Sequence, residues 1–241
     1  MKKIKVVIVD DERLSREELK RALKPYDDFI LIGEAENADD AKDLIESEMP
    51  DLLFLDIKMP EKSGFDLLES LNNVPAVLFI TAYDQYAVQA FEVNALDYLM
   101  KPVREERFAK AIEKIRDTFK LKSALNNIET EDRKIFIKDG EKRFFIRLDE
   151  IYLIESLENY TRLFFQNKKA LQRRSLRQWE EILDENTFFR INRAEIINMN
   201  FIQEVNITSA GRMEVKLKTG ELLEVSNRQS VKFKNSNGFN K

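Results

Sequence analysis

Cysteine and histidine are both absent from the 241 residues of this chain. Without cysteine, the chain can form neither a disulfide nor a thiol nucleophile, and without either residue it lacks the usual ligands of a zinc site. Without histidine, it has no imidazole to serve as a general base. Any chemistry must therefore use carboxylates, hydroxyls, ammonium groups, or a metal ion held by oxygen ligands.

Glycine and long apolar runs are also scarce. The six glycines stand too far apart to form a G-x-G-x-x-G or P-loop motif. No stretch approaches the ~20 apolar residues that a membrane helix needs. The N-terminal segment MKKIKVVIVDDE reaches acidic residues too soon to be a secretory signal. We therefore expect a cytoplasmic protein without membrane insertion.

Proline and charge are distributed unevenly. All five prolines lie in residues 1–119, which carry 17 basic against 26 acidic residues, a net charge of −9. Residues 120–241 carry 23 against 18, a net charge of +5. This asymmetry predicts two domains, and the 43% hydrophobic content is enough for two cores. The basic half is a candidate partner for a polyanion, although a solvated basic surface would look the same.

Four apolar runs each end in polar side chains. They are VVIVDD (6–11), FLDIKMP (54–60), FITA (79–82) and YLMKP (98–102), which lead to Asp10 and Asp11, Asp56, Thr81 and Lys101. Such runs are typical of parallel strands buried on both faces. Because the carboxyl ends of parallel strands line one crevice, we expect these side chains to meet there.

The first half alternates strand and helix, which predicts a parallel α/β sheet. Strands are expected at 4–9, 30–35, 52–56, 76–81 and 97–100, and helices at 13–24, 38–48, 64–71, 84–93 and 104–122. Residues 120–133 are polar and predict a linker. From 134 onward the hydrophobic period changes to 2, which predicts a mostly β domain. One helix is expected there at 175–185, with Ser175 as its N-cap, and a short turn at 193–199.

The three carboxylates predict a cation site. Asp10, Asp11 and Asp56 would repel one another unless a cation lay among them, and Mg²⁺ prefers oxygen ligands. Lys101 would add a second positive charge and Thr81 a hydrogen bond, while Asp56 is the natural nucleophile for an acyl phosphate. Each piece alone has an ordinary explanation, since an acidic pair often caps a helix and Lys-Pro often forms a turn.

Together, these motifs resemble the receiver domain of bacterial two-component response regulators over roughly 1–119. The matching features are the acidic pair, LDIKMP followed by Gly64, Thr81 in TA, Tyr98, and Lys101-Pro102. The resemblance implies a flavodoxin-like five-stranded fold and phosphorylation of Asp56, with Thr81 and Tyr98 as switch residues. It also implies Mg²⁺ held by Asp11, Asp56 and the Lys58 carbonyl, with Asp10 acting mainly through water. A chain without histidine needs a separate histidine kinase as phosphoryl donor.

Basic residues gather in the second half without a helix-turn-helix or zinc-finger pattern. The cluster contains Arg162, Lys168, Lys169, Arg173, Arg174, Arg177, Arg190, Arg193 and Arg228, with Asn159, Asn192 and Asn227 beside some of them. Arginine can read guanine and asparagine adenine, while lysine and arginine also contact phosphates. Scattered surface arginines on a β domain are the alternative. The apolar residues Phe188, Phe189, Ile191, Ile196, Ile197 and Trp179 are predicted to form a core.

Four segments of this half resemble the LytTR DNA-binding domain, over about 134–235. They are IYLIESLENYTRLFF, RRSLRQWEEIL, FFRINRAEIINMNFI and LLEVSNRQS. The resemblance implies that loops enter the major groove of double-stranded DNA. Carried over by position, the residues expected to face DNA are Asn159, Tyr160, Thr161, Arg162, Asn192, Arg193, Asn227 and Arg228, with Lys168, Arg173 and Arg174 from the basic cluster. Asn192 stands where family members often have histidine.

The sequence therefore predicts a cytoplasmic response regulator of the LytR/AlgR type rather than an enzyme. Its expected divisions are a receiver at 1–119, a linker at 120–133 and a mostly β LytTR-type domain at 134–238. Phosphorylation should promote homodimerisation and binding to paired operator sites. Three alternatives remain at this point. They are a metal-dependent phosphatase, for which D-x-D would be expected instead of DDE, a nucleotide-binding enzyme, and a phosphorylated module that binds protein or RNA.

Overall fold

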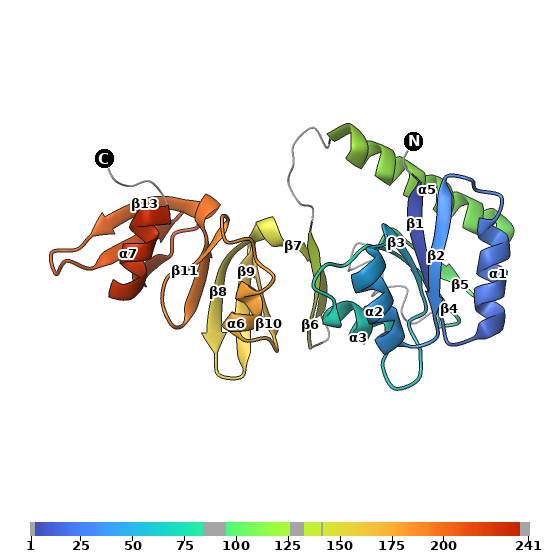
Figure 1. Ribbon diagram of the computed structural model, residues 1–241, viewed down its shortest axis with the longest axis horizontal. Helices are drawn as coiled ribbons and strands as arrows, with labels where there is room; N and C mark the ends of the chain where they lie inside the picture. Colours follow the sequence, from blue (N-terminus) through green and yellow to red (C-terminus); the bar gives the residue numbers. More distant parts are fainter. Residues whose placement is uncertain (1–2, 84–94, 126–132, 141, 237–241) are drawn as a thin grey trace. The chain divides into compact units, whose positions relative to one another are not determined.

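The computed structural model describes residues 3–83, 95–125, 133–140 and 142–236, which divide into two compact units (Figure 1). Unit 1 consists of Met1–Phe136 and Lys142–Phe145, and unit 2 of Ile137–Glu141 and Ile146–Lys241. Among the described helices, none is both long and apolar enough to span a membrane.

Unit 1 is built on a parallel sheet of five strands in the order β2-β1-β3-β4-β5. The strands are β1 (Ile4–Val9), β2 (Phe29–Ala35), β3 (Leu52–Leu55), β4 (Ala76–Thr81) and β5 (Asp97–Met100). The predicted flavodoxin-like sheet is confirmed, with each strand end within one residue of its predicted position. The strand order reverses at β1, so a crevice forms beside the carboxyl ends of β1 and β3.

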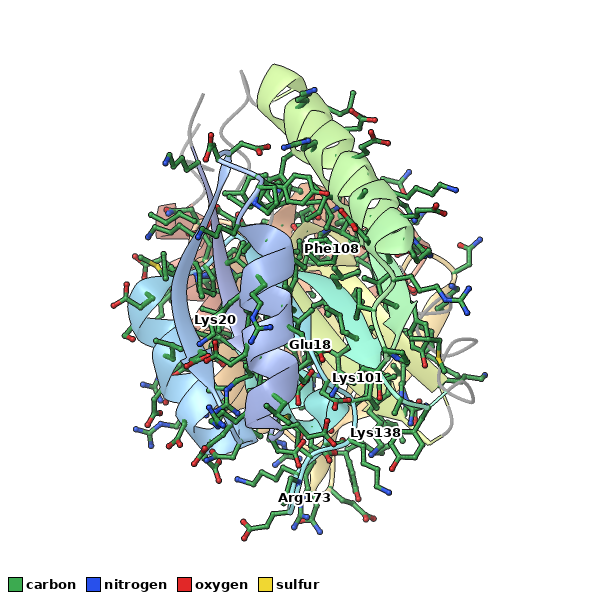
Figure 2. The ribbon with its side chains drawn as sticks, turned by 90° about the vertical axis from the view of Figure 1, so that its right-hand side faces the viewer. Glu18, Lys20, Lys101, Phe108, Lys138 and Arg173 are labelled. Carbon is green, nitrogen blue, oxygen red and sulfur yellow. The ribbon has the colours of Figure 1, made fainter. Side chains whose placement is uncertain are left out.

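Helices cover both faces of this sheet, as Figure 1 shows. They are α1 (Arg13–Leu23), α2 (Ala38–Glu48), α3 (Gly64–Ser70) and α5 (Glu105–Leu125). Because successive strand residues point to opposite faces, Val7 and Val9 pack with α2 and α3, whereas Val6 and Ile8 pack with α1 and α5. On the second face Phe108 of α5 is buried among the strand residues, at the position labelled in Figure 2. Burial on both faces explains why the strands are apolar throughout.

One predicted helix of unit 1 cannot be compared with the structure, and another is longer than predicted. The predicted helix at 84–93 lies outside the described residues. The last helix, α5, runs to Leu125, three residues beyond its predicted end at 122. It therefore occupies part of the segment predicted as a linker.

A two-stranded sheet of β6 (Lys134–Asp139) and β7 (Lys142–Arg147) follows. Within unit 1, the ring of Phe136 stacks on Phe65 of α3 with 5.9 Å between centroids, and the Arg143 guanidinium lies 4.8 Å from the centroid of the Phe65 ring. The backbone N–H of Val74 donates to the Lys134 carbonyl at 2.8 Å. The core of unit 1 thus includes side chains from beyond residue 133.

Unit 2 is mostly β, as predicted. An antiparallel sheet has the strand order β10-β9-β8-β12-β11, and a second sheet has the order β13-β14-β15. The strands are β8 (Ile151–Leu157), β9 (Tyr160–Phe165), β10 (Lys168–Gln172), β11 (Phe188–Arg190), β12 (Glu195–Asn198), β13 (Ile202–Ile207), β14 (Met213–Leu217) and β15 (Leu222–Val225). The helices are α6 (Leu176–Glu180) and α7 (Asn227–Ser236), and short 3-10 turns are η2 (Leu148–Glu150) and η3 (Met199–Phe201).

Two local predictions for unit 2 are corrected by the structure, and one helix was missed. The expected turn at 193–199 is wrong, because β12 occupies most of it and pairs with β8. The helix expected at 175–185 ends at Glu180, although Ser175 is its N-cap as predicted and forms a capping box with Gln178. The C-terminal helix α7 was not predicted.

The predicted apolar core of unit 2 is confirmed. Trp179, Ile191, Ile196 and Ile197 are fully buried, and Phe188 is nearly so. Phe189 is partly buried and packs against Phe233 of α7 at 5.2 Å between ring centroids. The aromatic residues therefore serve as core and not as an exposed stacking surface.

Candidate functional site

The predicted carboxylate cluster forms at the edge of the unit 1 sheet. One oxygen from each of Asp10, Asp11 and Asp56 lies within 4.8 Å of the others. The pairing of β1 with β3 causes this arrangement, since Val9 is in register with Leu55 and the backbone N–H of Asp56 donates to Val9 at 2.8 Å. The residues that follow these two strands are therefore neighbours. Asp10 and Asp56 are almost completely buried.

Lys101 supplies positive charge to this cluster. Its Nζ lies 2.7 Å from Asp10 Oδ2 and 2.8 Å from Asp56 Oδ2. Burial by itself lowers the pKa of Lys101, but hydrogen bonds and charge attraction from Asp10 and Asp56 outweigh it, so this pKa is raised. The Lys101 backbone N–H donates to the Thr81 carbonyl at 2.9 Å, which fixes the segment after β5 beside β4. The ammonium group therefore stays protonated between two carboxylates.

Asp10 is also held by groups from α1, which the sequence analysis did not identify. Its Oδ2 accepts a hydrogen bond from Ser15 Oγ at 2.5 Å, and its Oδ1 accepts one from the backbone of Glu12 at 3.0 Å. Arg16 donates to the Asp10 carbonyl at 2.7 Å. A serine in the first turns of a helix gives no local signal of this contact. Both Asp10 oxygens are thus engaged, which leaves Asp11 as the more available ligand beside Asp10.

The loop after Asp56 is tightly constrained. The backbone N–H of Lys58 donates to Asp56 Oδ1 at 3.2 Å, and Gly64 donates to the Ile57 carbonyl at 2.8 Å. A Cβ atom on Gly64 would overlap with the backbone oxygen of Asp56. Ser63 caps α3 through a capping box with Asp66. Gly64 therefore permits the close approach that holds the Asp56 loop against α3.

Thr81 is the last residue of β4, and Tyr98 lies on the adjacent strand β5, in register with Phe79. Thr81 is fully buried, and its Oγ1 has no hydrogen-bond partner within the described part of the chain. The Tyr98 ring is 9% exposed, and its hydroxyl donates to the Tyr83 carbonyl. A buried hydroxyl without a partner is unfavourable, so Thr81 is ready to donate to an acceptor that enters the crevice.

The donor set of this crevice fits Mg²⁺. Carboxylate oxygens and a nearby backbone turn are the hard ligands that Mg²⁺ prefers, and the described cluster contains no softer ligand. Because Lys101 already compensates part of the negative charge, one divalent cation would suffice to balance Asp11 and Asp56. The acidic cluster is therefore typical of a magnesium site.

The predicted basic residues of unit 2 gather around two pockets. One pocket is lined by Asn159, Tyr160, Arg173, Arg174 and Arg193, together with Ser156, Glu158, Ser175, Leu176, Arg177, Gln178 and Arg190. The other is lined by Asn192, Arg193 and Arg228, together with Glu180, Arg190, Ala194, Glu195, Glu224, Ser226, Gln229 and Lys232. Arg190 and Arg193 line both pockets, so the predicted loops lie along one continuous surface of unit 2.

Some predicted DNA-facing residues lie elsewhere or are already engaged. Thr161 is 1% exposed and its hydroxyl accepts a hydrogen bond from Trp179 Nε1 at 2.8 Å, so it is a core residue in this structure. Arg162 pairs with Glu155 at 3.2 Å. The guanidinium of Arg174 lies 4.9 Å from the Trp179 ring.

Lys168 and Asn227 are exposed but line neither pocket. The acidic residues Glu180, Glu195 and Glu224 line the second pocket and were missed, because an isolated glutamate in a basic segment carries no functional signal.

Both units match known families. The model of the response regulator receiver domain matches residues 6–113, and that of the LytTr DNA-binding domain matches residues 141–237. The sensory transduction protein LytT of Enterococcus faecalis is 33% identical over 239 residues, which cover 97% of this chain and 99% of that protein. The chain belongs to the response regulators that join a receiver domain to a LytTR DNA-binding domain.

A second curated relative agrees with this assignment. The transcriptional regulatory protein BtsR of Salmonella typhi is 32% identical over 241 residues, which cover 98% of this chain and all of that protein. A solved structure of the response regulatory domain of protein mrkE from Klebsiella pneumoniae is 30% identical, has a TM-score of 0.46, and covers 49% of this chain and 99% of that domain.

Family membership decides between the functional alternatives. This response regulator is a transcriptional regulator and not an enzyme, so the phosphatase and nucleotide-binding alternatives are wrong. A receiver domain implies a histidine kinase as partner, and a LytTR domain implies DNA binding.

Proposed function

We propose that phosphorylation of Asp56 by a separate histidine kinase controls the binding of this chain to specific double-stranded DNA sequences in the cytoplasm. The observation that carries the proposal is the arrangement of Asp56 beside two further carboxylates and the Lys101 ammonium, with the unpartnered Thr81 hydroxyl at the end of the adjacent strand β4. This arrangement supplies a nucleophile, countercharge and a hydrogen-bond donor at one edge of the sheet.

In the proposed transfer, an oxygen of Asp56 attacks the phosphorus of a phosphohistidine. A bond forms between that oxygen and phosphorus, the phosphorus–nitrogen bond breaks, and the electron pair leaves with the imidazole. Asp56 accepts the group as an acyl phosphate. Lys101 then pairs with a phosphoryl oxygen, and Thr81 donates a hydrogen bond to another. The donor must be another protein, because this chain contains no histidine.

Mg²⁺ would be held by Asp11, Asp56 and the Lys58 carbonyl, with Asp10 acting through water. When bound, the ion neutralises the negative charge that gathers on the phosphoryl oxygens. The hydrogen bonds of Asp10 to Ser15 and Glu12 support its indirect role. The Asp56 N–H to Val9 bond keeps the nucleophile at the mouth of the crevice.

For DNA binding, we propose that the surface shared by the two pockets of unit 2 faces the duplex. Arg193 and Arg228 are exposed, and neither guanidinium has a partner among the described residues, so both can reach base edges. Asn159, Tyr160 and Arg173 flank them, and Lys168 supplies phosphate contact. The sequence-based divisions 1–119, 120–133 and 134–238 place the phosphoacceptor in the first and the DNA contacts in the third, although α5 extends into the second and Phe136 of the third packs in the core of unit 1.

The test combines labelling and DNA binding. Acetyl phosphate should label the wild-type chain only when Mg²⁺ is present, as read by intact-mass spectrometry. Asp56→Asn should abolish labelling, whereas Asp43→Asn, an exposed carboxylate on α2, should leave it unchanged. Full labelling of Asp56→Asn would show that another residue is the phosphoacceptor.

The DNA half is tested with a duplex selected by the wild-type chain from a randomised library. Arg193→Ala and Arg228→Ala should each weaken binding to this duplex by ~1–3 kcal/mol and relax its sequence preference. Equal losses on the selected duplex and on random duplex, measured by fluorescence anisotropy, would disprove base reading by these residues.

A further inference from the structure

The segment between β11 and β12 carries Arg193 at its exposed tip. Its backbone is tied on both sides within unit 2. The backbone N–H of Ser156 donates to the Ala194 carbonyl at 2.7 Å, and that of Ser226 donates to the Ile191 carbonyl at 3.0 Å. The N–H of Ile191 donates to the Glu195 carbonyl at 3.1 Å and closes the loop. This loop, residues 190–195, is therefore fixed before any ligand arrives.

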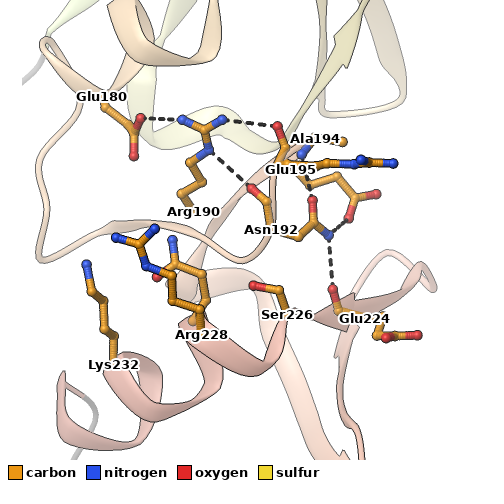
Figure 3. Close-up of a pocket in the computed structure, with 11 residues that line it drawn as sticks. Glu180, Arg190, Asn192, Ala194, Glu195, Glu224, Ser226, Arg228 and Lys232 are labelled. Atoms are coloured by element: carbon orange, nitrogen blue, oxygen red, sulfur yellow. Dashed lines mark hydrogen bonds and ion pairs between the residues drawn. The ribbon is translucent and has the colours of Figure 1, made fainter.

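Arg190 strengthens the loop from within, as Figure 3 shows. Its Nε donates to the Asn192 carbonyl at 3.1 Å, and its Nη2 donates to the Arg193 carbonyl at 3.0 Å. Its Nη1 donates to Glu180 Oε2 of α6 at 2.7 Å. One guanidinium thus holds two successive loop carbonyls and is itself anchored to a helix. These contacts leave Arg190 poorly placed to bind DNA.

Asn192 is engaged in the same way. Its Nδ2 donates to Glu195 Oε2 at 2.6 Å and to the Glu224 carbonyl at 3.0 Å, and its Oδ1 accepts from the Ala194 N–H at 2.8 Å (Figure 3). An asparagine that reads adenine needs one amide N–H and its oxygen for the base edge. Both N–H donors of Asn192 are already used inside unit 2.

The acidic residues of the pocket support the view that Arg190 and Asn192 hold the loop in place. Glu180 and Glu195 lie beside the surface proposed to face phosphates, where an uncompensated carboxylate would weaken DNA binding. Glu180 pairs with Arg190 and Glu195 accepts from Asn192. An ordering role for the loop therefore explains why these two carboxylates stand in a basic pocket. A loop ordered in advance loses less conformational entropy when DNA binds.

We infer that Arg190 and Asn192 are positioning residues, which hold the 190–195 loop so that Arg193 reads the base edge. Asn192 then contributes to specificity through Arg193 and not by direct contact with a base. The inference rests on the proposed function, because it requires the pocket surface of unit 2 to face DNA.

The experiment measures base preference with the full chain and the selected duplex library described above. Asn192→Ala and Arg193→Ala should relax preference at the same base pairs, each by about 5- to 150-fold. The double variant should be no worse than Arg193→Ala alone, since residues that act through one contact are not additive. The salt dependence of binding by Asn192→Ala should equal that of the wild type, because no phosphate contact is lost.

Glu180→Ala gives a second test, because its expected effect on overall DNA affinity and its expected effect on base preference have opposite directions. Removing a negative charge should leave unchanged or strengthen binding to random duplex. Loss of the Arg190 anchor should nevertheless relax the preference at the Arg193 base pairs. The control is Asn206→Ala, an exposed asparagine of β13 outside both pockets, which should not alter preference. The single buried tryptophan, Trp179, reports by fluorescence whether each variant is folded.

Two results would overturn the inference. The first is a loss by Asn192→Ala at base pairs that Arg193→Ala leaves intact, with additive effects in the double variant, which would make Asn192 a direct reader. The second is a base preference of the Glu180→Ala variant that is identical to that of the wild type, which would show that the Arg190 anchor does not position Arg193. If the wild-type chain selects no sequence at all, the proposed DNA function fails instead, and this outcome is distinct from both.

Discussion

Gly64 illustrates how a single backbone position supports the proposed phosphorylation site. A Cβ at this residue would overlap with the Asp56 carbonyl, which cannot move without disturbing the nucleophile. At Gly33, by contrast, a Cβ would meet the flexible end of the Leu44 side chain at 2.8 Å. The same substitution should therefore have different costs at the two glycines.

We predict that Gly64→Ala destabilises unit 1 by ~1–3 kcal/mol, the usual cost of overpacking, and slows labelling of Asp56. Gly33→Ala is the matched control and should cost less, because Leu44 can change rotamer. Urea denaturation gives the stabilities, and acetyl phosphate labelling gives the rates. Equal costs at the two positions would contradict the close-approach explanation.

Thr161 shows how a residue expected at the DNA surface can belong to the core. Its hydroxyl accepts the Trp179 indole N–H, and both side chains are buried. We predict that Thr161→Val destabilises unit 2 by ~1–3 kcal/mol, because the indole N–H loses its partner. The folded variant should keep the wild-type base preference. Urea denaturation followed by Trp179 fluorescence gives the stability, and a changed base preference would restore Thr161 as a DNA contact.

At the scale of elements, β5 and α5 are joined by an ion pair next to Tyr98. Both guanidinium ends of Arg107 donate to Asp97, at 2.8 and 2.6 Å. Burial alone raises the pKa of Asp97, but the hydrogen bonds from Arg107 outweigh it, so this pKa is lowered. Asp97 precedes Tyr98, so the pair also fixes the strand that carries the proposed switch residue.

The lowered pKa predicts a pH dependence of stability. The stabilisation by Asp97 should be fully present above the unfolded pKa of ~3.9 and should be lost as the pH falls through the folded pKa. Asp97→Asn should cost ~1–2 kcal/mol at neutral pH, a modest value because Arg107 is 44% exposed and solvent screens the pair.

Urea denaturation between pH 7 and about pH 3 checks this prediction. The stability difference between the wild type and Asp97→Asn should shrink as the pH falls. Asp43→Asn serves as the control, since this exposed carboxylate should give a difference near zero throughout. A difference between wild type and Asp97→Asn that stays constant with pH would exclude the ion pair as its cause.

At the scale of the whole molecule, the question is how phosphorylation of the receiver domain would change DNA binding by the LytTR domain. Thr81 ends β4, which pairs with the strand that precedes Asp56, and its hydroxyl has no partner among the described residues; Tyr98 lies on the next strand and is buried. We propose that a phosphoryl group draws the Thr81 hydroxyl toward it and favours the buried position of Tyr98. The face of β5 and α5 would then favour pairing of two receivers.

We predict that phosphorylation promotes dimerisation and binding to two similar sites about two helical turns, or ~21 base pairs, apart. A tether between two DNA-binding domains can raise affinity by ~10²–10⁴-fold without new DNA contacts. Light scattering with and without acetyl phosphate measures dimerisation, and duplexes with shifted spacing measure the tether effect. Tyr98→Ala should reduce both responses. A phosphorylated chain that stays monomeric both free and on DNA would rule out this mechanism.

The sequence alone determined the five-stranded sheet of unit 1 and the strand-end residues that meet at its edge. Strands buried on both faces must be apolar throughout, so β1, β3, β4 and β5 are visible as runs of local sequence. The residues that follow them are local as well, and a parallel sheet brings strand ends together. Asp10, Asp56 and Lys101 could therefore be predicted as neighbours although they are far apart in the chain.

Only the tertiary structure decided the roles of residues in unit 2. Thr161 is buried because Trp179 of α6 packs over it, and Asn192 is engaged because the Glu224 carbonyl lies opposite. Strands such as β11, with three residues, are too short to show a hydrophobic period. These contacts join elements that are far apart in the sequence, and no local sequence pattern indicates that they pack together. A polar side chain reads the same in the sequence whether it faces solvent or a buried partner, so the packing of its neighbours decides its role.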